Sequence, residues 1–174
     1  VVVGSSFGAV IALDLARRYP ELVRALVLCE PPMAQSDMMA AVPDGFACHF
    51  DQLVETEGGP AAAEFFLRSV LGDTAFDKMP AMYRKRSMDA WSQIRDDMFA
   101  LGCYRPRYAE LADQIRCPTY LCGGDRSAPF YRDTLDMLEM SIPGAERLVL
   151  RGAGHMMQVD AHRQFNELLR RVVL

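Results

Sequence analysis

Short apolar runs and longer amphipathic stretches alternate at the two ends of the chain. The short runs are rich in Val, Leu and Cys and end at Gly, Pro or a charged residue, which predicts buried strands. They cover Val1–Val3, Arg24–Cys29, Pro118–Cys122 and Glu146–Leu150. Helical patterns follow them over Phe7–Tyr19, Pro129–Ser141 and Val159–Val173. Strands that alternate with helices predict an α/β fold built on a parallel sheet.

The middle of the chain carries helical patterns without a strand signal. They cover Phe46–Glu57, Pro60–Leu71, Pro80–Ala100 and Tyr108–Ile115. A bare connection between two parallel strands needs about one helix and short loops. We therefore expect a core made of residues 1–32 and 114–174 and an inserted helical unit at 33–113. The insertion contains Met33, Met38, Met39 and Met98, whose flexible side chains could line an apolar pocket or simply fill the helix core.

The first strand leads directly into Gly4-Ser5-Ser6-Phe7-Gly8, and a helical pattern follows. A G-x-S-x-G sequence between a strand and a helix is the signature of a nucleophile elbow. The tight turn would strain the backbone of Ser6 and lift its hydroxyl above the sheet, and we expect side chains at positions 4 and 8 to clash. By itself the motif is weak, because an ordinary Gly/Ser turn can match it.

One polar residue follows the carboxyl end of each of two later predicted strands. Gly123-Gly124-Asp125 follows one strand, and Gly152-Ala153-Gly154-His155 follows the next. Ligands of open parallel sheets bind at this edge. The order Ser6, Asp125, His155 predicts a nucleophile, an orienting acid and a general base, since a serine hydroxyl needs a base whose own pKa lies near neutrality.

Residues 1–32 and 116–174 resemble the carboxyl-terminal two-thirds of an α/β-hydrolase. The stretch GAGHMMQVDAHRQFNELLRRVVL is similar to the histidine loop and last helix of that family. The resemblance implies that the four strands are the last four of the family's sheet and that residues 33–113 form its helical cap. It also offers Glu30 as an alternative to Asp125, because some members place the acid after the strand that Glu30 follows.

The resemblance implies acyl transfer to water, because members that displace halide or open epoxides use Asp where this chain has Ser6. The expected substrate is a small apolar or acyl molecule with an ester, thioester, lactone, amide or activated carbon–carbon bond, and no cofactor is implied. The backbone N–H of Phe7 would be one oxyanion donor. The alternatives are a non-catalytic binding protein or inactive fragment of the same fold, and perhydrolase or acyltransferase activity at the same triad.

Composition narrows the partners. The net charge of −4 gives no basic patch for nucleic acid, and no run of eighteen apolar residues predicts a membrane span. Five cysteines without C-x-x-C spacing predict reduced thiols and a cytoplasmic location, and three histidines without ligand spacing predict no metal. The strand Val1–Val3 would have an unpaired edge, which predicts self-association. The chain lacks the strands that precede the elbow in the family, so we expect a fragment with little activity of its own.

Overall fold

A computed structural model describes residues 1–34 and 41–173. The chain forms two compact units, one of Val1–Met39 with Arg105–Leu174 and one of Ala40–Tyr104. The second unit lies within the 33–113 insertion expected from the sequence. It is shorter because helix α7 (Tyr108–Gln114) belongs to the first unit, where the Tyr108 hydroxyl donates to the carbonyl oxygen of Ala34.

The first unit is built on a four-stranded parallel sheet. Its strands are β1 (Val2–Ser5), β2 (Leu26–Cys29), β3 (Thr119–Gly124) and β4 (Glu146–Leu150), in the spatial order β1-β2-β3-β4. The α/β architecture and the four strands expected from the sequence are thus confirmed. Within the described residues β1 is an outer strand of the sheet, with the side chain of Val3 44% exposed; self-association there stays a prediction.

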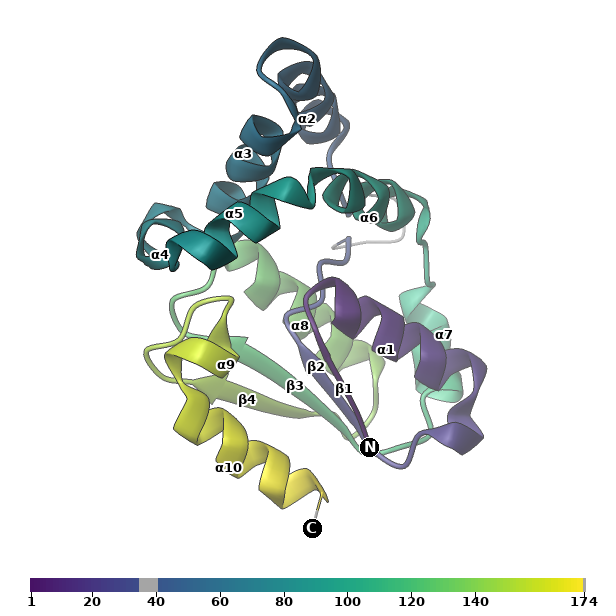
Figure 1. The fold of residues 1–174 in the computed structure, drawn as a ribbon. Coiled ribbons are helices and arrows are strands. Elements are labelled where there is room, and N and C mark those ends of the chain that lie inside the picture. The colour runs from purple at the N-terminus through teal and green to yellow at the C-terminus, as the bar shows by residue number, and fades with distance from the viewer. Residues whose placement is uncertain (35–40, 174) are drawn as a thin grey trace. The chain divides into compact units, whose positions relative to one another are not determined.

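Helices cover both faces of this sheet (Figure 1). They are α1 (Phe7–Arg18), α7, α8 (Pro129–Ser141), α9 (Met157–Asp160) and α10 (His162–Val173), with a short 3-10 turn, η1 (Pro20–Leu22). Side chains alternate along β3, so Gly123 faces Leu135 of α8, whereas Cys122 faces α9 and α10. The expected helix Val159–Val173 is divided at Ala161 into α9 and α10.

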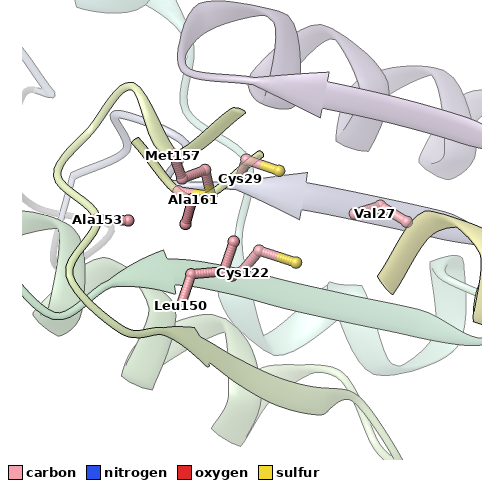
Figure 2. Packing of buried hydrophobic residues seen from close by; sticks show 7 residues of the cluster. All are labelled: Val27, Cys29, Cys122, Leu150, Ala153, Met157 and Ala161. Atoms are coloured by element: carbon pink, nitrogen blue, oxygen red, sulfur yellow. The ribbon is translucent and has the colours of Figure 1, made fainter. Parts of the chain in front are cut away.

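One buried apolar cluster joins the sheet to α9 and α10 (Figure 2). Its members are Val27, Cys29, Cys122, Leu150, Ala153, Met157 and Ala161. Apolar side chains of α10 pack against it, including Phe165 and Leu168. Because Ala153 and Met157 lie two residues before and after His155, burial of their side chains holds the histidine loop against the sheet.

The second unit is helical throughout its described part. It contains α2 (Asp44–Thr56), α3 (Gly59–Leu71), α4 (Asp73–Lys78), α5 (Ala81–Asp89) and α6 (Trp91–Cys103). Phe50, Ala62 and Met98 form its buried core. Met33 is buried in the first unit, and Met38 and Met39 lie outside the described residues.

The expected helix Pro80–Ala100 is two helices, divided at Ala90. Ala90 is a good helix former, so nothing in the sequence marks the break. Both α5 and α6 contact α3, and the Trp91 ring at the start of α6 lies against Gly59. We therefore attribute the break at Ala90 to the packing of both α5 and α6 against α3.

Candidate active site

Ser6 occupies a strained turn between β1 and α1. Its φ of 54° and ψ of −128° lie outside the regions that residues with a side chain ordinarily adopt. The Ser6 amide donates to the Cys29 carbonyl oxygen at 2.8 Å, which ties the turn to β2. A Cβ at Gly4 would lie 2.3 Å from the carbonyl oxygen of Gly8, so the strand and helix approach too closely for any side chain at position 4.

Gly8 has a different environment from the one expected. Among the described residues, a Cβ built at Gly8 meets no atom within 4 Å. The expected clash at position 8 is therefore wrong for this part of the chain. The physical reason is that the close approach to position 4 is made by the backbone carbonyl of Gly8, whereas a side chain at position 8 would enter open space.

His155 is buried and is held by Glu30. The two side chains are 6% and 1% exposed, and His155 Nδ1 lies 2.7 Å from Glu30 Oε2. Residues 125 positions apart in sequence meet because β2 and β4 end at the same edge of the sheet. A carboxylate on Nδ1 favours the tautomer that donates from Nδ1 and leaves Nε2 as the acceptor.

Glu30 follows β2 directly and adopts a φ of 47°, a left-handed conformation that is rare for a residue of this type. Its second oxygen, Oε1, accepts a hydrogen bond from the Gly124 amide at 2.8 Å. Both carboxylate oxygens therefore have partners, as a buried acidic group requires. The strained backbone and the two bonds fix the direction in which Glu30 faces His155.

Asp125, the acid that the sequence favoured, lies beside the histidine loop but bonds elsewhere. Its Oδ1 accepts from the Gly152 amide at 2.7 Å, and its own amide donates to the Leu150 carbonyl oxygen. Nδ1 of His155 is occupied by Glu30, so the geometry corrects the expected pairing of Asp125 with His155. Both carboxylates follow strands that end at one edge, and only the local turns decide which one reaches the imidazole.

The ring of Tyr131, in the first turn of α8, stacks on the imidazole of His155. The two rings have centroids 4.2 Å apart and planes 14° apart. Burial, together with the charge of Glu30, raises the pKa of the Tyr131 phenol above its ordinary value. Tyr131 was not expected from the sequence; its place a few residues after the end of β3, on the segment that begins at Asp125, is the signal that could have indicated it.

Two groups are suited to acyl chemistry. Nε2 of His155 is buried and has no hydrogen-bond partner among the residues that the structure describes. Phe7 is the first residue of α1, and amides in the first turn of a helix have no acceptor within the helix. The amino end of α1 also carries the positive end of the helix dipole, and this favours a negative charge beside the Phe7 amide.

The described part of the chain contains no group of three His, Cys, Asp or Glu residues able to hold a metal ion. In the same residues, no helix combines the length and the apolar character that crossing a bilayer requires. All five cysteines are free, with Cys29 and Cys122 buried on neighbouring strands.

A family model described as "Alpha/beta hydrolase family" matches residues 1–168. The chain therefore belongs to the alpha/beta hydrolase family, and the resemblance expected from its sequence is confirmed. A search of the curated proteins found no match.

Solved structures share the fold at low sequence identity. The enzyme Est816, described as degrading N-acyl homoserine lactones, is 22% identical over 98% of this chain with a TM-score of 0.69. The enol-lactonase from Burkholderia xenovorans LB400 is 19% identical over 97% with a TM-score of 0.68, and a bromoperoxidase from Bacillus anthracis is 18% identical over 96% with a TM-score of 0.74. The chain spans 66%, 63% and 64% of these three proteins.

Proposed function

We propose that this chain carries the catalytic serine, base and acid of a hydrolase that cleaves small acyl compounds. Ser6 is the nucleophile, His155 the general base and Glu30 the carboxylate that orients it. The observation that carries the proposal is the buried His155–Glu30 pair, whose Nδ1–Oε2 distance is 2.7 Å, together with the strained turn at Ser6. Both belong to the same unit of the chain.

In the reaction, Nε2 of His155 takes the proton of the Ser6 hydroxyl as Oγ forms a bond to the substrate carbonyl carbon. Glu30 stabilises the resulting imidazolium and keeps its own negative charge. The Phe7 amide donates to the carbonyl oxygen as it becomes an oxyanion. The imidazolium then gives its proton to the leaving group as the bond to it breaks, and water hydrolyses the acyl-Ser6 ester by the same steps.

The substrate class follows from the nucleophile and from the kinds of protein that share the fold. Esterases and lactonases are among the similar structures, which supports an ester, thioester or lactone. A second candidate is perhydrolase or acyl transfer at the same acyl-serine, supported by the similar structures named bromoperoxidases. Competition between water, an alcohol and hydrogen peroxide for the acyl group separates the two functions.

The first prediction concerns Ser6 and its exposed neighbour Ser5. In a full-length protein that contains this chain, Ser6→Ala removes the nucleophile, so we expect turnover of an activated ester to fall by about 10⁴–10⁶-fold. Ser5→Ala is the matched control and keeps activity within a few-fold. A fluorophosphonate should label the wild type and Ser5→Ala but not Ser6→Ala. A Ser6→Ala protein that retains a tenth of the wild-type turnover contradicts the assignment. A wild type that neither cleaves the ester nor reacts with the fluorophosphonate favours the binding-protein alternative.

The second prediction separates the two carboxylates. Glu30→Gln keeps the shape but loses the charge that fixes the tautomer of His155, so kcat should fall by about 10²–10⁴-fold. Asp125→Asn still offers an oxygen to the Gly152 amide, and we expect it to stay within tenfold of the wild type. Steady-state kinetics of both variants decide the matter: an inactive Asp125→Asn beside an active Glu30→Gln would return the acid role to Asp125.

A further inference from the structure

The imidazole of His155 has a flat neighbour in addition to its hydrogen-bond partner. Glu30 holds one ring atom, Nδ1, and a single hydrogen bond leaves the ring free to tilt about that bond. The Tyr131 ring lies parallel to the imidazole, with centroids 4.2 Å apart and planes 14° apart. This separation is about the contact thickness of two aromatic rings, so the tilt is blocked on that side.

The position of Tyr131 is fixed through α8. Thr134, three residues further along the helix, is fully buried, and its hydroxyl lies within hydrogen-bond distance of the Phe130 carbonyl oxygen at 3.0 Å and of the Met33 carbonyl oxygen at 3.2 Å. Met33 lies three residues after Glu30, so one helix is tied to the segment that supplies the carboxylate. Leu135 of the same helix lies against Gly123, beside the amide of Gly124 that binds Glu30. The tyrosine, the carboxylate and the imidazole are therefore linked through neighbouring segments of the same unit.

We propose that Tyr131 is a positioning residue for His155. Its ring fixes the plane of the imidazole, and with it the direction in which Nε2 points, and its electron-rich face stabilises the imidazolium that forms during proton transfer. The inference rests on the proposed function only in giving His155 the role of base. The effect comes from the aromatic face, so the hydroxyl of Tyr131 is dispensable.

Three substitutions test the role of the face. Tyr131→Phe keeps the ring, whereas Tyr131→Leu and Tyr131→Met fill the space without a plane. Loss of orientation at a reacting group lowers the rate by about tenfold to a hundredfold. We expect kcat to fall by that factor in Tyr131→Leu and Tyr131→Met, with KM changed less than threefold. In Tyr131→Phe we expect kcat to stay within threefold of the wild type. Leu138→Val, on the same helix and fully buried, is the control for loss of stability alone and keeps kcat.

Proton NMR of the same proteins supplies a readout that does not depend on turnover. A ring stacked on His155 shields its carbon-bound protons, and a fixed Glu30–His155 bond protects the Nδ1 proton from exchange. We expect both signals to be kept in Tyr131→Phe, and the shielding to be lost and the Nδ1 proton to exchange faster in Tyr131→Leu and Tyr131→Met. A His155→Gln protein identifies the signals.

The outcomes separate this inference from the proposed function. If the wild type lacks Ser6-dependent turnover, the proposed function fails and the NMR series alone decides whether Tyr131 orients the ring. If Tyr131→Leu and Tyr131→Met keep wild-type kcat and a protected Nδ1 proton, the inference is overturned. It is also overturned if Tyr131→Phe is as impaired as Tyr131→Leu, because the hydroxyl would then carry the effect.

Discussion

Two residues of the candidate site, Ser6 and Glu30, have a strained backbone. Ser6 and Glu30 are the non-glycine residues with positive φ among those that the structure describes. They follow β1 and β2, and both face the carboxyl edge of the sheet. Such strain costs about 1–3 kcal/mol at each residue and persists only where the surroundings enforce it. Here the amides of Ser6 and Glu30 donate to the Cys29 and Cys122 carbonyl oxygens, and the Gly124 amide donates to Oε1 of Glu30.

The two glycines of the elbow give a residue-scale prediction. Gly4→Ala places a methyl group 2.3 Å from a carbonyl oxygen of α1, and such overpacking should destabilise the fold by about 1–3 kcal/mol or more. Gly8→Ala meets open space among the described residues and lies in a helix, where Ala is favoured over Gly by about 0.5–1 kcal/mol. Urea unfolding measures both. Equal destabilisation by the two substitutions would contradict the asymmetry.

At the scale of elements, the site depends on where strands end. β2, β3 and β4 are parallel and in register, so Glu30, Asp125 and His155 emerge at the same edge. The turn after β3 is joined to the histidine loop by a hydrogen bond from the backbone amide of Arg126 to the Ala153 carbonyl oxygen at 2.9 Å. A Cβ at Gly124 would lie 2.3 Å from that same oxygen. The two turns are therefore one packed layer that supports His155.

Packing of α3 against α6 gives a prediction for the second unit. A Cβ at Gly59 would lie 2.2 Å from the ring of Trp91, so Gly59→Ala should displace the indole and destabilise this unit by about 1–3 kcal/mol. The control is Gly102→Ala in α6, where a Cβ meets no described atom within 4 Å and the change should be neutral or stabilising. Unfolding followed by the fluorescence of Trp91, the single tryptophan, reports both.

At the scale of the whole molecule, the fold is shared with proteins of low sequence identity. Structures that are 18–22% identical to the chain match it with TM-scores of 0.68–0.74. Fold is kept because the alternation of strands and helices constrains apolar pattern more than residue identity.

Stability at alkaline pH is the whole-molecule prediction. The fold raises the pKa of the Tyr131 phenol above its ordinary value of 10.0, first by burial and then through the charge of Glu30. The neutral phenol is therefore favoured in the folded state. Its contribution is fully present below pH 10 and is lost as pH rises further, because the unfolded chain then releases a proton that the folded chain keeps.

Tyr131→Phe isolates this contribution. Between pH 9 and 11 we expect the free energy of unfolding of the wild type to fall more steeply than that of Tyr131→Phe, with the two curves parallel below pH 9. Chemical unfolding at each pH measures the difference. Parallel curves over the whole range would show that the phenol ionises equally well in the folded and unfolded chains.

The amino-acid sequence by itself determined the four strands and the position of the elbow turn. These are local properties: apolar runs end at turn residues, and G-x-S-x-G lies between a strand and a helix. For the same reason the carboxyl edge of the sheet could be expected to hold Ser6, Glu30, Asp125 and His155. Helix boundaries came within a few residues, except that helix α4 (Asp73–Lys78) was not expected and that packing divided a continuous pattern at Ala90 and Ala161.

Tertiary structure alone decided which of these residues meet. The bond between Glu30 and His155 spans 125 positions, and its geometry depends on a left-handed backbone at Glu30 and on the Gly152 turn that engages Asp125. The stack of Tyr131 on His155 depends on how α8 is fixed against β3. Contacts of this kind are set by the register of strands and by the packing of helices, and neither leaves a trace in the local pattern of apolar and polar residues.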